Sequence, residues 1–144
     1  MSPDILVRRH RLAHLDGLFE LAVMFCWFMV GLSWAFMPEI ASVKSPVGQS
    51  VDGWSAVWTF GYITAAPAAA FGLLLKKVNV RVAGLIGMTT CLLVHGIATV
   101  AYSDGDPRTL VYFSYAAACG VRAFMLTRYT MNSMKGCPNA APLD

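Results

Sequence analysis

Several ionisable residues lie within the long apolar stretches of this sequence, and three of them are candidate functional residues. Glu20 lies in the first stretch, His95 in the third and Arg122 in the fourth. A carboxylate or an imidazole there could take up and release a proton, and a guanidinium could pair with an acid or bind an anion. An arginine at the centre of a bilayer costs about 2.5 to 3.5 kcal/mol on insertion scales, so Arg122 needs a partner or a route to water.

Two interpretations of Glu20 and Arg122 are open. Arg122 is expected about 10 Å from one end of its span, at ~1.5 Å per residue, and Glu20 lies near the corresponding end of the first span. Their matched depth and opposite charge predict an ion pair between the first and fourth spans. Alternatively, Arg122 extends to the lipid headgroups and Glu20 is hydrated at the membrane surface.

His95 could relay protons or bind haem. Haem held between helices usually needs a second axial ligand, and the other apolar stretches contain no histidine. A buried histidine that bonds to a neighbouring hydroxyl or carbonyl is the favoured interpretation. His10 and His14 have the spacing of a metal-binding pair, but three nearby arginines would repel a cation. We therefore expect no cofactor and no bound metal.

The sequence also lacks the motifs of common enzymes. It contains no P-loop, no G-x-S-x-G, no H-E-x-x-H and no G-x-G-x-x-G. Its cysteines form no C-x-x-C pair, so they are interpreted as small apolar residues. We assign no catalytic residue and expect the protein not to be an enzyme.

Composition indicates which elements must position these residues. Hydrophobic residues make up 57% of the 144-residue chain and charged residues 13%, about half the roughly 25% that is usual in soluble domains. Four apolar stretches approach the roughly 20 residues that cross about 30 Å of hydrocarbon, and helices satisfy their backbone groups internally. The sequence predicts an all-α, integral membrane four-helix bundle over residues 15–130. Its spans are expected at about 15–37, 54–75, 82–102 and 110–129.

The flanking segments are expected to be polar. Residues 1–14 are predicted to be a basic cytoplasmic segment in which a short amphipathic helix leads into the first span, and 131–144 a flexible cytoplasmic tail. A cleaved signal peptide is not expected, because the first span is too long for its apolar region. The stretch KKVNVR, 76–81, is expected to be a six-residue turn. Five aromatic residues are expected to form a belt at the outer membrane boundary: Trp34, Trp54, Trp58, Tyr102 and Tyr112.

Basic residues predict the orientation in the membrane. One face is expected to collect most of them: Arg8, Arg9, Arg11, Lys76, Lys77, Arg81, Arg128 and Lys135. The other face receives Lys44 and Arg108. The positive-inside rule then places both termini in the cytoplasm and the protein in the cytoplasmic (inner) membrane. Since the basic residues flank spans and form no continuous stripe, the lipid bilayer is the expected partner, and nucleic acid is not.

Small residues recur at spacings that allow helices to approach closely. Three pairs have the small-xxx-small pattern: Ala68 and Gly72, Ala83 and Gly87, and Ala116 and Gly120. Packing within one bundle is expected to use most of them. A remainder could serve self-association, so a homo-oligomer is expected.

The overall pattern resembles small four-span holin-like membrane proteins of actinobacterial double-stranded DNA phages. The resemblance rests on SPVGQSVDGWSAVWTFGY after the first span, on VRVAGLIG beside basic residues, and on the late arginine in YAAACGVRAFMLTRY. It implies a lysis protein that accumulates in the cytoplasmic membrane, oligomerises and permeabilises it. An endolysin then acts downstream without direct contact. The smallest holins differ from this chain in having one to three spans. A phage accessory membrane protein that modulates lysis or excludes a second phage fits the same sequence.

Two other classes of function are open. Four spans and an acid in the first span superficially resemble small proton-coupled multidrug transporters, although a fixed cation at the depth of Glu20 would repel a cationic substrate. A non-catalytic accessory subunit of a larger membrane complex is the third possibility.

Overall fold

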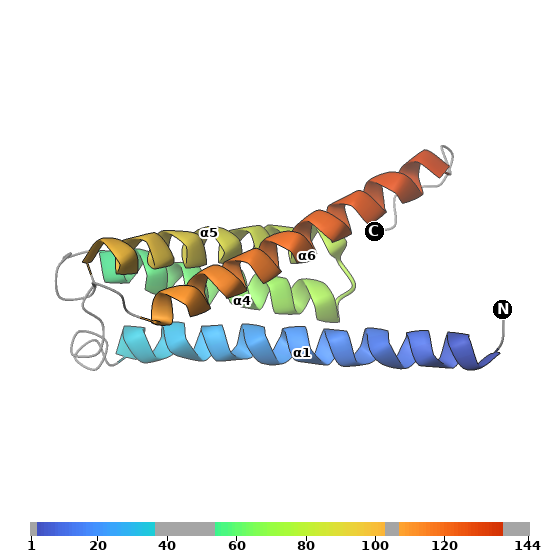
Figure 1. The fold of residues 1–144 in the computed structure, drawn as a ribbon, viewed down its shortest axis with the longest axis horizontal. Helices are drawn as coiled ribbons and strands as arrows, with labels where there is room; N and C mark the ends of the chain where they lie inside the picture. The colour runs from blue at the N-terminus through green and yellow to red at the C-terminus, as the bar shows by residue number, and fades with distance from the viewer. Residues whose placement is uncertain (1–2, 37–53, 103–106, 137–144) are drawn as a thin grey trace.

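The computed structural model describes residues 3–36, 54–102 and 107–136, and these residues form four α-helices (Figure 1). The helices are α1 Pro3–Phe36, α4 Trp54–Leu74, α5 Val78–Tyr102 and α6 Arg108–Gly136. The expected all-α four-helix bundle is confirmed.

Consecutive helices run in opposite directions and pack in chain order, α1 against α4, α4 against α5 and α5 against α6 (Figure 1). The first turns of α5 therefore lie at the same end as the last turns of α4 and α6. We call this end the basic end, because Lys76, Lys77 and Arg128 are exposed there. The N-terminal turns of α1 and the C-terminal turns of α6 extend beyond the other helices at this end.

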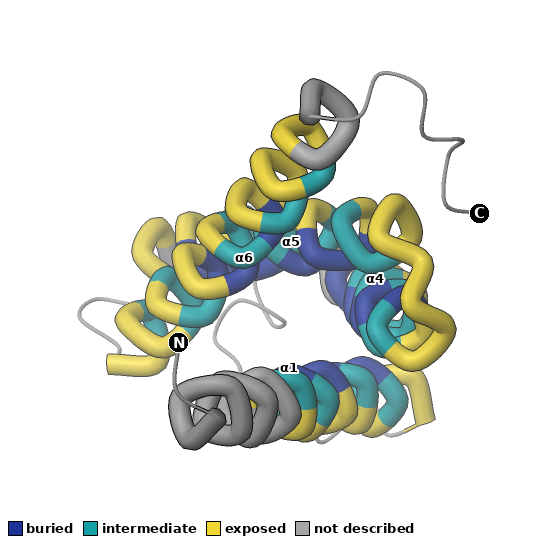
Figure 2. The backbone as a smooth tube through the Cα atoms, turned by 90° about the vertical axis from the view of Figure 1, so that its right-hand side faces the viewer, coloured by how far each residue is buried: buried dark blue, intermediate teal, exposed yellow. Residues whose placement is uncertain are grey.

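The interior of the bundle and its exterior are both apolar. Met24, Tyr62, Met88 and Leu92 are buried, whereas many large apolar residues are exposed. Buried positions of the helices lie toward the inside of the bundle and exposed positions toward its outside (Figure 2). Phe19, for example, is 69% exposed. Among the described residues, three helical segments are long and apolar enough to cross a membrane: Asp16–Phe36, Val78–Ala101 and Arg108–Asn132. The apolar segment Trp58–Leu74 of α4 is shorter.

The ends of α1 and α6 differ from the expected domain boundaries. α1 is one unbroken helix of 34 residues, so residues 3–14 of the predicted basic segment form its first turns and no separate short helix. No proline follows Pro3 within α1 to interrupt its backbone bonds. α6 continues to Gly136, so the expected flexible tail begins with helical residues. Methionine and lysine in this segment are good helix formers.

The expected six-residue turn at KKVNVR is wrong, because α5 already begins at Val78. Lys76 adopts the left-handed conformation (φ 56°) that often follows a helix end, and its N–H donates to the carbonyl of Leu73 at 3.3 Å. The N–H of Arg81 then donates to the carbonyl of Lys77 at 3.1 Å. The short turn places Arg81 in the first turns of a helix.

Glycines allow α4 and α5 to approach closely beside this turn. A Cβ at Gly84 would overlap the backbone of Ala69, and a Cβ at Gly72 would overlap the backbone of Arg81. Small residues thus serve packing within the bundle, as at close helix contacts in membranes. The other small residues in the predicted pairs lie as follows: Gly87 against Ala65, Ala116 buried, Gly120 beside Thr89, Ala68 half-buried and Ala83 exposed.

Candidate functional site

Four charged side chains from three helices meet near the basic end. Asp16 and Glu20 lie one turn apart on α1, so their carboxylates lie on the same side of that helix. Arg81 comes from α5 and Arg122 from α6. We call these four residues the charge cluster.

Glu20 is the centre of the charge cluster. The Nε of Arg81 donates to Oε1 of Glu20 at 2.8 Å, while its Nη2 donates to Oε2. The Nε of Arg122 donates to the same Oε2 at 3.2 Å, and its Nη2 pairs with Asp16. Both carboxylate oxygens of Glu20 are therefore bonded to guanidinium groups, and the bidentate pair with Arg81 is the stronger geometry.

Burial separates the inner pair of the charge cluster from the outer pair. The side chains of Glu20 and Arg81 are 9% and 12% exposed, whereas Arg122 is 33% and Asp16 52% exposed. Two acids and two bases balance in formal charge, which lowers the cost of enclosing them in an apolar bundle.

The sequence suggested only part of the charge cluster. Glu20 and Arg122 are in contact. This agrees with the first of the two interpretations, an ion pair between the first and fourth spans. Arg81 was missed because it was assigned to a turn, although its position beside an apolar span was a usable signal. Asp16 was missed as well, yet its spacing from Glu20 indicates a shared helix face.

A second polar group lies deeper in the bundle, around His95. The imidazole is 1% exposed and lies between two aromatic rings, with Trp58 at 4.6 Å and Tyr112 at 4.1 Å between ring centroids. Both rings are stacked on it, with interplanar angles of 10° and 21°. Trp34 lies 5.2 Å away in a tilted orientation. We call His95 and these three residues, together with Tyr62, the aromatic cluster.

The Tyr62 hydroxyl forms a hydrogen bond with one ring nitrogen of His95. The Tyr62 oxygen lies 2.9 Å from Nδ1 of His95, in a hydrogen bond between two buried side chains. His95 is therefore bonded to a neighbouring hydroxyl, as the favoured interpretation proposed. Within the described part of the chain, no group of three or more His, Cys, Asp or Glu side chains is placed to hold a metal ion.

The expected aromatic belt is partly wrong. Trp58 is 2% exposed and belongs to the core, because its ring stacks on His95. Trp34 and Tyr112 are half-buried against the same imidazole. The side chains of Trp54 and Tyr102 lie outside the described residues, as do those of His10 and His14.

Long side chains connect α1 to α6. Trp27 of α1 contacts Tyr115 and Tyr112 of α6, with ring centroids 5.7 Å and 6.0 Å apart. Nearer the basic end, Arg122 of α6 bonds to Asp16 and Glu20 of α1. We call these contacts the α1–α6 seam. Because the main packing of α1 is on α4, the α1–α6 seam depends on a few aromatic and charged side chains.

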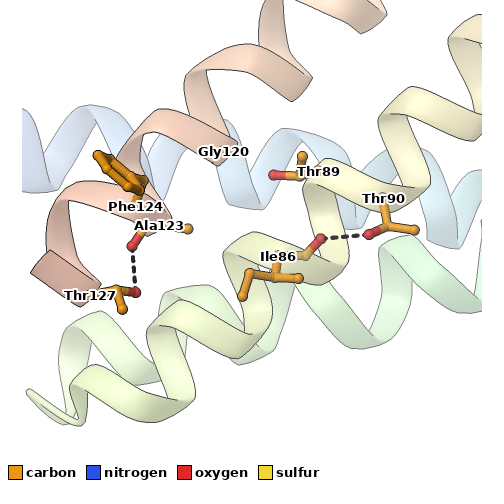
Figure 3. A pocket seen from close by; sticks show the side chains of 7 residues that line it. All are labelled: Ile86, Thr89, Thr90, Gly120, Ala123, Phe124 and Thr127. Atoms are coloured by element: carbon orange, nitrogen blue, oxygen red, sulfur yellow. Dashed lines mark hydrogen bonds between the residues drawn. The ribbon is translucent and has the colours of Figure 1, made fainter.

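A shallow groove of about 310 Å³ lies between α5 and α6 on the outside of the bundle. Figure 3 shows the seven residues that line it: Ile86, Thr89, Thr90, Gly120, Ala123, Phe124 and Thr127. Two of the threonine hydroxyls donate to carbonyls of their own helix in the same view, Thr90 to Ile86 and Thr127 to Ala123. We call this feature the α5–α6 groove.

Comparison of the chain with protein-family models, with curated proteins and with solved structures finds no match. Inference about function therefore depends on the residues and their geometry.

Proposed function

We propose that this chain is an integral protein of the cytoplasmic membrane that assembles with further copies and permeabilises the membrane during lysis, as holin-like proteins do. The observation that carries the proposal is the charge cluster. A lesion-forming protein must first accumulate without leaking, with its polar groups paired inside each molecule. It must later expose polar groups to the water in the lesion.

The α1–α6 seam provides a place where such a change can begin. Arg122 holds α6 to both acids of α1, and Trp27 supplies the aromatic contacts beside it. If α1 and α6 separate in a single molecule, these charges meet lipid, which is costly. If several molecules separate around a common lumen, the same charges meet water. Opening is then favoured only after assembly.

All four helices are proposed to cross the membrane, with both termini in the cytoplasm. α4 contains 21 residues, which extend about 31 Å at ~1.5 Å per residue and match a hydrocarbon layer of about 30 Å. Exposed Lys76, Lys77 and Arg128 at the basic end support the positive-inside orientation.

The multidrug-transporter alternative receives less support from the same site. A proton-coupled carboxylate must be free to exchange a proton for a cationic substrate. Both oxygens of Glu20 instead accept bonds from Arg81 and Arg122, and the two guanidinium groups would repel a cation.

Controlled expression in a bacterium, with membrane potential and growth followed together, tests the proposal. We expect an abrupt loss of potential after a reproducible delay, and lysis only when an endolysin is supplied. Arg122→Ala at the same membrane level should shorten the delay because it removes the bonds from α6 to α1. The neighbouring lipid-facing change Val121→Ala should leave the delay unchanged. Continued growth with the potential intact, despite verified insertion, would overturn the proposal.

A further inference from the structure

The α5–α6 groove has a cation beside one of its walls. Phe124 lines the groove, and the guanidinium Cζ of Arg128 lies 5.5 Å from the centroid of its ring. This cation–π contact holds the side chain of Arg128 close to the groove. Arg128 lies one helical turn beyond Phe124, toward the C-terminal end of α6 and hence toward the basic end.

The surface of the groove itself is apolar in character. Thr89, Thr90 and Thr127 each donate their hydroxyl to a carbonyl of their own helix at 2.8 to 3.0 Å. These hydroxyls are therefore already bonded, and the threonines contribute methyl groups. Gly120 leaves space on the opposite wall, because a Cβ there would make only an ordinary contact with Thr89 at 3.5 Å. An aliphatic chain fits such a surface better than a polar ligand.

The charges near the groove are complementary to an anion. Arg81 and Arg122 at this end of the bundle are paired with Glu20 and Asp16. Arg128, Lys76 and Lys77 are exposed there in addition to those balanced pairs. The basic end therefore carries a positive surface at the level where a bilayer presents its headgroups.

We propose that the α5–α6 groove binds one acyl chain of an anionic phospholipid whose phosphate is held by Arg128. From Arg128 to Gly120, α6 rises about 12 Å at ~1.5 Å per residue, so the groove receives the part of an acyl chain nearest the headgroup. Basic sites between helices bind anionic headgroups in this manner. The inference requires insertion in a membrane but does not depend on lesion formation.

Native mass spectrometry of the full chain in detergent, titrated with phosphatidylglycerol or phosphatidylcholine, tests the site. We expect one phosphatidylglycerol to bind at least fivefold more tightly than phosphatidylcholine. Arg128→Gln should remove this preference and Arg128→Lys should keep most of it. Thr90→Trp fills the groove from α5 and should weaken the binding of both lipids at least fivefold. Circular dichroism of each variant verifies that its helices are intact.

Two matched changes separate this site from general effects. Lys76→Gln removes a cation from the same end, and Ile97→Trp places the same bulk on an exposed position of α5 outside the groove. Lys76→Gln should lower the preference for phosphatidylglycerol much less than Arg128→Gln does, and Ile97→Trp should bind phosphatidylglycerol like the unchanged chain. Equal losses in Lys76→Gln and Arg128→Gln would overturn the site in favour of diffuse electrostatic attraction. If Thr90→Trp abolishes dimers but leaves lipid binding unchanged, the lipid site is overturned, and the groove instead binds a second copy of the chain.

Lipid binding and lesion formation give separate outcomes. A chain that binds phosphatidylglycerol as described but leaves the membrane potential intact overturns the proposed function alone. A chain that depolarises the membrane without preference for phosphatidylglycerol overturns the lipid site alone.

Discussion

Arg81 of α5 holds Glu20 of α1 through two bonds, one of them 2.8 Å long from Nε to Oε1. Both side chains are almost fully enclosed, at 12% and 9% exposure. α1 packs mainly on α4, so this pair joins α1 to a helix beyond its main neighbour. Arg122 then adds α6 to the same carboxylate. One buried acid thus connects three helices of the bundle.

Glu20→Gln is expected to destabilise the bundle strongly. The change removes the acid that Arg81 binds and leaves Asp16, which pairs with Arg122, as the remaining acid of the charge cluster. Breaking a buried ion pair by removing one partner costs about 3 to 5 kcal/mol. Titration of the protein in detergent micelles with sodium dodecyl sulfate, followed by tryptophan fluorescence, measures this loss.

Asp16→Asn is the matched control for that change. The side chain of Asp16 is 52% exposed, and an exposed ion pair contributes less than about 1 kcal/mol. A loss in Asp16→Asn as large as in Glu20→Gln would contradict this expectation and show that the outer pair contributes as much to stability as the buried one.

Exchanging the charges of Glu20 and Arg122 is not expected to restore the stability that either single charge reversal removes. In the double variant Glu20→Arg, Arg122→Glu, the new arginine at position 20 faces Arg81, and the new acid at position 122 faces Asp16. Like charges at both contacts should leave the double variant no more stable than the weaker single variant. Unfolding in sodium dodecyl sulfate gives the comparison, and full recovery would contradict the contact between Arg81 and Glu20.

Glu20→Gln combined with Arg81→Gln should recover part of the loss. The double change removes one acid and one base, so Arg122 and Asp16 still balance. Contacting residues in one network couple by about 0.5 to 3 kcal/mol, and we expect a value in the upper half of that range. Additive losses in the two single variants would indicate independent side chains.

Tyr62→Phe is expected to cost about 1 to 3 kcal/mol. It removes the hydroxyl 2.9 Å from Nδ1 of His95 and leaves a buried nitrogen without that partner. The double change Tyr62→Phe, His95→Phe removes both polar partners and should be less destabilising than Tyr62→Phe alone. Tyr129→Phe, at a 77% exposed position of α6, is the control and should have no measurable effect. Equal stability of Tyr62→Phe and the unchanged protein would show that the bond contributes nothing.

The number and class of the helices could be predicted because long apolar stretches in lipid have few alternatives to helix. The contact between Glu20 and Arg122 could be proposed because depth in a membrane follows from distance along each span. Arg81 could not be assigned in this way, because its place in a helix depends on where α5 begins. A start at Val78 puts Arg81 in the first turn, whereas a start a few residues later leaves Arg81 in the preceding turn. The stacking of Trp58 and Tyr112 on His95 depends on the rotation of each helix about its axis, which apolar composition all around a helix does not fix.

Glycine changes at two positions are expected to have opposite effects on stability. A Cβ at Gly84 would overlap the backbone of Ala69, so Gly84→Ala must push α5 away from α4. Overpacking of this kind typically costs about 1 to 3 kcal/mol. A Cβ at Gly17 meets no atom within 4 Å, so Gly17→Ala should stabilise α1 by about 0.5 to 1 kcal/mol through its better helix propensity.

The two glycine variants can be compared by the same unfolding titration, because each adds one methyl group to a helix. A loss of stability in Gly84→Ala together with a gain in Gly17→Ala would show that the close helix contact lies between α4 and α5. Destabilisation by Gly17→Ala as large as by Gly84→Ala would mean that another surface covers α1 near Asp16. In that case the outer part of the charge cluster would lie inside an interface between copies, and the loss should decrease as protein is diluted in detergent.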